Sequence, residues 1–141
     1  MFRRLKIISV FLLLFLIFLP SLALAQTAVG KFTFLQGRVD VLRQPAPRAM
    51  PVKMGDAVFV GDIIRAKSSS KAEITFNDGN IVRVAPNTRV EISEYMFDDA
   101  KGKGLLKLSR GKVQAIIQGK IAKRIATFGE ANRFEIHTPT A

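Results

Sequence analysis

The sequence predicts an all-β fold: a single compact antiparallel β-sandwich or β-roll of short strands and hairpins. Short stretches of alternating apolar and polar residues recur about every eight to twelve residues with turn residues between them, a pattern typical of these folds. No sustained helical periodicity follows the first 25 residues. The chain of 141 residues has no cysteine, so its stability must come from core packing and sheet hydrogen bonds.

The start of the chain has the features of an export signal, which we expect to form a helix ahead of the β-domain. A basic stretch at residues 3–6 precedes a nearly continuous apolar run at residues 7–19. The small residues at 23–25 match a signal-peptidase site. Because the apolar run is shorter than the ~20 residues of a spanning helix, cleavage is favoured over an uncleaved anchor. We therefore divide the chain into a signal peptide, residues 1–25, and a β-domain, residues 26–141.

The β-domain is expected to begin with a hairpin and a loop. Apolar and polar residues alternate over residues 30–43, with a turn at residues 35–37, which predicts two paired strands. Pro45 and Pro47 follow. Since neither proline can donate a hydrogen bond to a sheet, residues 44–50 are expected to form an exposed loop.

The most characteristic stretch contains a Gly-Asp pair that occurs twice, as Gly55-Asp56 and Gly61-Asp62. Glycine can adopt a positive φ, and an aspartate beside it can cap a backbone amide two residues further on. Each pair therefore predicts a tight corner, with a short apolar stretch between the two. Gly111 is likewise assigned to a tight turn.

A hairpin is predicted around Asn77-Asp78-Gly79. A three-residue turn made by these residues pairs Ile74 with Val82, which keeps the apolar face continuous. It also sets Glu73 opposite Arg83 on the solvent face. A two-residue turn would instead place an arginine opposite the core residue Ile74. We therefore expect the three-residue turn, with glycine in the left-handed position.

The second half of the chain is expected to add further strands. Alternation predicts four of them, at residues 89–95, 106–109, 113–117 and 133–137, with a mobile loop at residues 98–104. Residues 118–130 fit either a short helical turn or a poor strand. Seven phenylalanines recur at strand spacing, and most are expected in the core: Phe32, Phe34, Phe59, Phe76, Phe97, Phe128 and Phe134. Phe59 lies in a short run between two turns, so one side of it is expected to be exposed.

The chain is strongly basic, with a formal net charge of +11. A basic exported domain could meet anionic polymers or head groups of the envelope. The positive charges are spread singly, however, and nowhere form a basic block. The favoured interpretation is therefore that they lie on the solvent-exposed faces of strands, and nucleic acid is not an expected partner.

The side chains that could carry chemistry do not form a catalytic or metal-binding motif. His137 is the single histidine and lies at an outward strand position. Asp56, Asp62 and Asp78 could converge on Ca²⁺, but each is better explained as a cap of its own turn, and no EF-hand spacing is present. We therefore expect no enzymatic activity, no metal and no cofactor.

The order of these motifs resembles the FecR-type domain family, named for a periplasmic regulator of ferric citrate uptake. Six features carry the resemblance: the hairpin with Gly30 and Gly37, residues 52–65 with both Gly-Asp pairs, residues 72–83 with Ala-Glu-x-x-Phe-x-Asp-Gly-x-x-x-Arg, Pro86-Asn87-Thr88, residues 106–113 and residues 134–141. It covers nearly all of the β-domain and implies a stand-alone, envelope-side FecR domain.

Two features depart from the family pattern. The family's Thr-Pro-Thr-Ala block usually continues into a Val-x-Gly-Val-Arg-Gly-Thr segment, which does not follow residue 141, so we expect a C-terminally truncated fragment. The regulator also carries a cytoplasmic anti-sigma segment before its membrane helix. Only a few residues precede the apolar run here, so direct control of a sigma factor is not expected.

The expected function is therefore a non-enzymatic domain in the periplasm or on the cell surface, which binds a protein partner or an envelope polysaccharide. Contact with a membrane is expected only through the signal segment, if that segment stays uncleaved. Loops held by a rigid sheet usually carry function, so the expected contact face lies near the Gly-Asp corners and the hairpin, with Phe59, Arg65 and Arg83 as contacts. The alternative is a periplasmic sensor domain that relays a transport signal, as in ferric citrate regulation.

Overall fold

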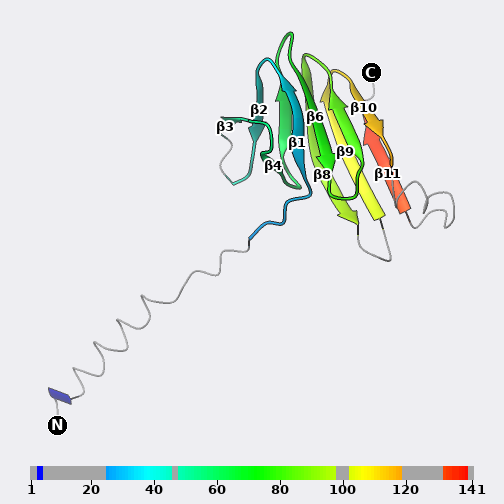
Figure 1. The fold of residues 1–141 in the computed structure, drawn as a ribbon. Helices are drawn as coiled ribbons and strands as arrows, with labels where there is room; N and C mark the ends of the chain where they lie inside the picture. Colours follow the sequence, from blue (N-terminus) through cyan, green and yellow to red (C-terminus); the bar gives the residue numbers. More distant parts are fainter. Residues whose placement is uncertain (1–2, 5–24, 46–47, 98–101, 119–131, 140–141) are drawn as a thin grey trace.

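The computed structural model describes residues 3–4, 25–45, 48–97, 102–118 and 132–139 (Figure 1). The described residues between Gly30 and His137 form eleven strands and no helix. The strands are β1 (Gly30–Gln36), β2 (Val39–Leu42), β3 (Ala49–Pro51), β4 (Ala57–Val58), β5 (Ile63–Ala66), β6 (Lys71–Phe76), β7 (Ile81–Val84), β8 (Thr88–Phe97), β9 (Gly102–Arg110), β10 (Val113–Ile116) and β11 (Asn132–His137).

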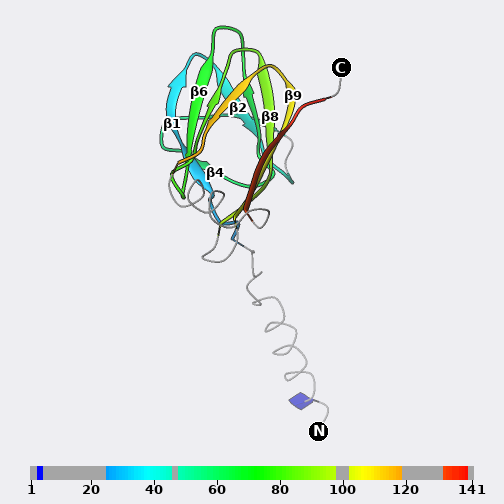
Figure 2. The ribbon, with the colours of Figure 1, turned by 90° about the vertical axis from the view of Figure 1, so that its right-hand side faces the viewer.

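The strands form two sheets that face each other across one core, as Figure 2 shows from the side. The five-stranded sheet has the order β10-β7-β6-β1-β4, and the six-stranded sheet has the order β11-β9-β8-β5-β2-β3. The expected all-β fold is therefore confirmed. The expectation of purely antiparallel pairing is wrong at one place, because β11 runs parallel to β9. Between these two strands the chain crosses to β10 in the opposite sheet, so it returns in the direction of β9.

The core consists of the inward side chains of both sheets, which alternate with outward polar residues along each strand. The five-stranded sheet contributes Phe32, Val58, Ala72, Ile74, Phe76, Val82 and Val84. The six-stranded sheet contributes Val39, Val41, Ile64, Ala66, Val90, Ile92, Tyr95, Leu106 and Leu108. These residues are mostly β-branched or otherwise apolar, which suits the inner face of a pleated sheet.

The chain repeatedly crosses from one sheet to the other, and each described crossing contains one residue with a positive φ. The six crossings use Gly37, Gly55, Gly61, Ser69, Asn87 and Gly111. Gly79 is the other described residue with a positive φ, and it lies in the hairpin between β6 and β7. A positive φ therefore marks a change of sheet at most of these positions.

The prediction of a hairpin over residues 30–43 is wrong, because the chain crosses to the other sheet between the two strands. β1 pairs with β4 and β6, whereas β2 pairs with β3 and β5 in the opposite sheet. The corner after β1 forms its hydrogen bonds with a neighbouring corner: the amide of Arg38 donates to the Ser70 hydroxyl at 2.8 Å, and its carbonyl accepts from the Lys67 amide at 3.1 Å. A glycine corner and a hairpin turn have the same local sequence, so alternation alone could not separate them.

Two further expectations are wrong locally. Part of the expected loop at residues 44–50 belongs to β3, an edge strand whose Pro51 lies opposite Asp40. Phe34 is 47% exposed, although it was expected in the core. A register shift in β1 between Phe32 and Phe34 turns the second ring outward, opposite Glu73.

The hairpin between β6 and β7 is confirmed in the expected register. Ile74 lies opposite Val82, and Glu73 lies opposite Arg83. The Arg83 guanidinium contacts the Glu73 carboxylate at 2.9 Å. Gly79, with a φ of 91°, closes the turn by donating its amide to the Phe76 carbonyl.

Some expectations lie outside the described residues. They concern most of the export signal and its helix, residues 98–101 of the expected loop, the segment at residues 119–131 with Phe128, and the chain end at residues 140–141. The rest of the loop expected over residues 98–104 is wrong, because residues 102–104 belong to β9 and pair with β8 and β11. The side chain of Phe97 is also outside the description. Among the described residues, no helix is both long and apolar enough to cross a membrane.

We predict that Gly111→Ala lowers the free energy of unfolding by clearly more than Gly55→Ala. Both glycines have a φ of 88°, so both substitutions introduce left-handed strain of about 1–2 kcal/mol. A Cβ at position 111 would also lie 2.6 Å from the Thr88 Cα and 2.7 Å from the Asn87 carbonyl oxygen, whereas a Cβ at position 55 would meet nothing within 4 Å. Urea unfolding of both variants measures the difference, and equal losses would contradict this assignment.

Candidate functional site

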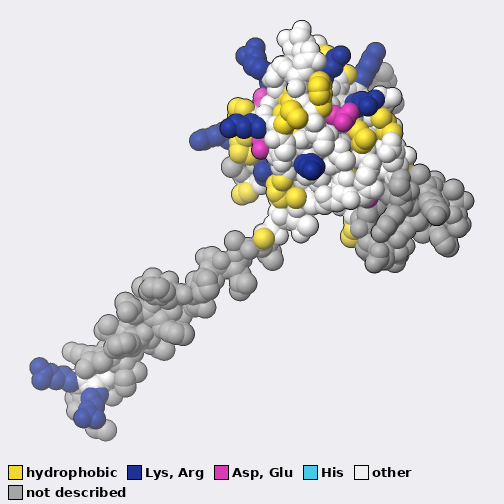
Figure 3. Space-filling model, viewed as in Figure 1, with side chains coloured by type: hydrophobic (Ala, Val, Ile, Leu, Met, Phe, Trp, Pro, Cys, Tyr) yellow, Lys and Arg dark blue, Asp and Glu magenta, His cyan; other side chains and the backbone are white. Residues whose placement is uncertain are grey.

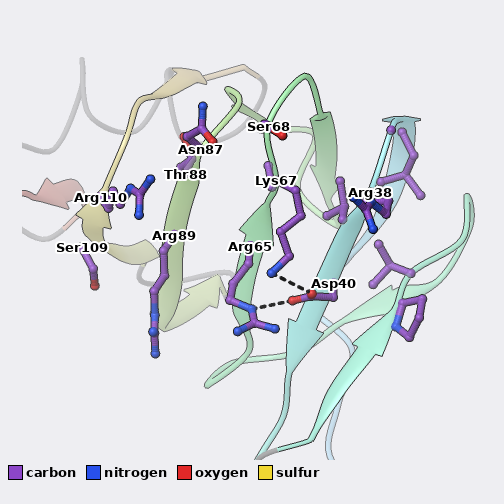
Figure 4. A pocket seen from close by; sticks show the side chains of 16 residues that line it. Arg38, Asp40, Arg65, Lys67, Ser68, Asn87, Thr88, Arg89, Ser109 and Arg110 are labelled. Carbon is purple, nitrogen blue, oxygen red and sulfur yellow. Dashed lines mark hydrogen bonds and ion pairs between the residues drawn. The ribbon is translucent and has the colours of Figure 1, made fainter.

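An open groove of about 900 Å³ lies along the six-stranded sheet beside the end of β1 and is the candidate site. Its walls come from β2, β3, β5, β8 and β9, from the end of β1 and from the corners beside them (Figure 4). The apolar lining residues are Leu35, Val39, Pro51, Val52 and Ala66. The polar lining residues are Arg38, Asp40, Arg65, Lys67, Ser68, Asn87, Thr88, Arg89, Ser109 and Arg110. Five of these are cations and one is an anion, so the groove carries a net positive charge.

Four charged residues of the groove form one row across neighbouring strands. Asp40 on β2 lies opposite Arg65 on β5, and Arg65 lies opposite Arg89 on β8. Arg89 in turn lies opposite Arg110 at the end of β9. A register shift in the β8–β9 pair between Arg89 and Val90 places Arg110 in this row. Three arginines on three adjacent strands are therefore direct neighbours.

Asp40 neutralises one end of the row. Its carboxylate accepts a hydrogen bond of 2.5 Å from Arg65 Nε and lies 3.4 Å from Lys67 Nζ, as the dashed lines in Figure 4 show. Partial burial raises the pKa of Asp40, but the hydrogen bonds and charges of Arg65 and Lys67 outweigh burial and hold this pKa below its ordinary value. The hydrogen bond to Asp40 likewise raises the pKa of Arg65.

The other end of the row is not neutralised. Within the described part of the chain, the side chains of Arg89 and Arg110 make no hydrogen bond and no ion pair. Both are exposed. Like charges directly opposite each other destabilise a sheet, so this arrangement opposes folding unless an anion lies between the guanidinium groups.

The charged side chains of the groove are suited to attracting an anion. The groove's single carboxylate, Asp40, is held in two ion pairs. Within the described ranges, no three His, Cys, Asp or Glu side chains gather into a metal site. His137 lies on β11, outside the groove lining, with its Nε2 2.8 Å from the Glu135 carboxylate.

The two predicted Gly-Asp corners have the same hydrogen bonds. In the first, the Asp56 amide donates to the Lys53 carbonyl, and its carboxylate accepts from the Lys53 amide at 2.8 Å. In the second, Asp62 makes the same two bonds to Phe59, with a carboxylate contact of 3.0 Å. The expected direction of capping is therefore wrong, since each aspartate caps the amide three residues before it. Asp78 does cap two residues onward, at the Asn80 amide.

Asp62 has a second role that the sequence did not indicate. Its side chain is fully buried, and its two oxygens accept hydrogen bonds of 2.7 and 2.8 Å from Arg43. The Arg43 guanidinium also lies 4.3 Å from the centre of the Phe59 ring. The hydrogen bond to Asp62 outweighs burial and raises the pKa of Arg43. Arg43 was included in the expected first hairpin, where no partner could be assigned to it.

Asp78 joins the hairpin to the opposite sheet. Its Oδ1 accepts a hydrogen bond of 2.6 Å from the Tyr95 hydroxyl, and the buried Asn80 amide donates to both residues. The Tyr95 ring stacks on Phe76 with centroids 3.9 Å apart. Burial, followed by the hydrogen bond to Asp78, raises the pKa of Tyr95 well above its ordinary range. The aspartates of the predicted motifs thus all have protein partners.

The three residues expected to contact a partner do not form one site. Arg65 lines the groove on the six-stranded sheet. Arg83 belongs to β7 of the five-stranded sheet, and Phe59 lies beneath Arg43 at the corner after β4. The sequence did not indicate Arg89 and Arg110, because they stand 21 positions apart and only the β8–β9 register brings them together.

The fold and the groove define a β-sandwich domain with a cationic outer face. The family model described as "FecR protein" matches residues 62–141, and the chain belongs to this family, as its motifs suggested. The family is regulatory or structural rather than enzymatic, and membership supports an envelope-side domain. A solved structure titled "Cell surface anchoring domain" is 31% identical over 46% of this chain and 84% of that chain, with a TM-score of 0.44. No curated protein matches the chain.

We predict that Arg43→Met lowers the free energy of unfolding by about 3–5 kcal/mol, because removing one partner leaves a buried charge uncompensated. Asp62 would retain only the Phe59 amide as a partner. The matched control is Arg83→Met, which removes the exposed pair with Glu73 and should cost no more than about 1 kcal/mol. Chemical unfolding of both variants tests this, and similar losses would refute a structural role for the Arg43–Asp62 pair.

We also predict that Arg89→Gln raises the free energy of unfolding at low salt, by up to about 1 kcal/mol, because it relieves repulsion from Arg65 and Arg110. The gain should shrink near 1 M salt, where the screening length is about 3 Å. Lys31→Gln serves as the control, since Lys31 lies opposite the uncharged residues Ala57 and Thr75. A gain that is independent of salt would contradict the electrostatic explanation.

Proposed function

We propose that this FecR-family chain is a non-enzymatic binding domain of the cell envelope, and that its ligand, a protein partner or an envelope polysaccharide, lies in the groove on the six-stranded sheet. The observation that carries the proposal is the uncompensated positive charge of Arg89 and Arg110 in an open groove. Such charge is unfavourable for folding alone, and an anionic ligand would remove the repulsion.

Several features support binding over catalysis. General acid–base and nucleophilic mechanisms need a titratable group near a reacting atom, positioned by a neighbour. The groove offers guanidinium and ammonium groups, which remain charged at neutral pH, and Asp40 is engaged by Arg65 and Lys67. The lining therefore suits attraction and orientation of an anion.

The proposed location rests on two observations. The basic and apolar stretches at the start of the sequence have the pattern of an export signal, which would deliver residues 26–141 to the periplasm or the cell surface. The family match supports an envelope-side domain.

The family match also favours a second candidate, a sensor role in which groove occupancy is relayed to a regulatory partner. The two candidates differ in what the ligand changes. In a binding domain, the ligand in the groove only attaches the protein to the envelope. In a sensor, filling the groove should also make the protein gain or lose a protein partner.

We expect the purified protein to sediment with isolated envelope fragments, and Arg89→Glu together with Arg110→Glu to abolish this retention. The matched control changes two exposed lysines outside the groove, Lys31→Glu and Lys53→Glu. Both variants alter the net charge by the same amount, so a general charge effect would weaken them equally. Equal retention of wild type and groove variant would refute the groove as the binding site.

A further inference from the structure

We propose that the groove binds a linear polyanion whose successive carboxylate or phosphate groups lie on Arg89 and Arg110. This inference rests on the proposed binding function and adds to it the ligand's chemistry and the residues that recognise it. It places the polymer across the strands, along the row formed by Asp40, Arg65, Arg89 and Arg110.

The spacing of the two arginines suits repeating charges. Arg89 and Arg110 are direct neighbours on antiparallel strands, and neighbouring strands lie about 4.7–4.9 Å apart. Both side chains are exposed and have no described partner. Their long, flexible stems let the guanidinium groups separate further than the strands do. Two anionic groups on adjacent units of one polymer can therefore each meet a guanidinium group.

The residue type narrows the chemistry of the ligand. A guanidinium group presents a planar fork of donors that fits the two oxygens of a carboxylate or phosphate, whereas an ammonium group acts as a point charge. Arginine occupies all three cationic positions of the row. Arg38 and Lys67 add positive charge beside it, so a ligand longer than two units remains in a favourable field.

The open shape of the groove favours a polymer over a small anion. A single ion pair at an exposed site contributes about 0–1 kcal/mol, which is too little to hold one small ion. Groups linked in one chain bind as a set, because the first contact raises the effective concentration of the next. The row provides several such contacts on one continuous surface.

The groove is less suited to an acidic protein. Protein interfaces depend on a few buried aromatic or large apolar anchors surrounded by a polar rim. The exposed large hydrophobic residues of the described chain are Phe34, Met50, Met54 and Met96, and none of them lines the groove. Figure 3 shows hydrophobic and positively charged side chains scattered over one view of the molecule, so positive charge alone does not distinguish the groove. The cross-strand row of arginines is the feature that distinguishes it.

Asp40 offers a test in which a substitution is expected to strengthen ligand binding. Its carboxylate occupies Arg65 and Lys67 and competes with any anionic ligand for them. Asp40→Asn would release both cations without changing the size of the side chain. Removing this charge should therefore tighten polyanion binding. If Asp40 only supported the local structure, the same substitution would weaken binding.

The experiment measures binding of the purified protein to polygalacturonate, a polycarboxylate, and to polyphosphate, with neutral dextran as a control. Titration calorimetry at several salt concentrations gives the affinity and its salt dependence, and circular dichroism checks folding. We expect Arg89→Gln and Arg110→Gln each to weaken binding about three- to fivefold, as for loss of one exposed ion pair. Lys31→Gln should change the affinity less than twofold, and Asp40→Asn should increase it several-fold. The polymer bound more tightly identifies which anionic group is preferred.

Several outcomes would overturn the proposal: no binding to either polymer at low salt, an equal loss with Lys31→Gln, or weaker binding with a folded Asp40→Asn variant. Retention on anionic lipid vesicles without binding to soluble polymer would assign the groove to a membrane surface, and envelope retention that is lost after protease treatment would assign it to a protein. Envelope retention that is lost with the arginine substitutions, without binding of the wild-type protein to either polymer, refutes the polyanion alone. Absence of any envelope retention by the wild-type protein refutes the binding function itself.

Discussion

The buried carboxylate of Asp62 is the constraint on which much of this fold depends. It accepts two hydrogen bonds from Arg43 and one from the Phe59 amide, and it has no contact with solvent. A carboxylate in this position destabilises the fold unless every partner is in place. Arg43 follows β2, Phe59 follows β4, and the backbone of Asp62 bonds to Ile92 on β8. Asp62 therefore connects β4 of the five-stranded sheet with β2 and β8 of the other.

The crossings between sheets explain how a chain with scattered charges produces a concentrated cationic face. Each strand keeps its apolar side chains inward, so every charge on β2, β5, β8 and β9 points away from the core. Residues from four separate segments then become neighbours on one outer face. The arginine row has a cost for folding, since like charges face each other. Binding sites commonly retain features that are unfavourable for stability, because the ligand supplies the missing interaction.

The sequence predicted those parts of the structure that depend on local pattern. The register of the β6–β7 hairpin followed from two opposed pairs, Ile74 with Val82 and Glu73 with Arg83, and the family followed from the order of the Gly-Asp motifs. The partition into two sheets could not be predicted, because a positive φ at Gly37 serves a crossing as readily as a hairpin. The groove could not be predicted for a related reason. Arg65, Arg89 and Arg110 are isolated charges in the sequence, and only the strand register shows that they are neighbours. Arg43 was likewise unremarkable until its distant partner was seen.

The pairing of distant strands has a consequence for how the chain reaches its native state. β6 and β7 can close within a few residues of each other, but β1 must find β6 some forty residues later, and β11 must find β9 after β10 has joined the opposite sheet. Loop-closure entropy has to be overcome before such contacts become favourable, and folds rich in them form slowly, on the order of milliseconds to seconds. During that interval the edges of both sheets remain open to other chains. A chain with this topology would therefore benefit from a chaperone that shields strand edges until β1 and β11 have docked.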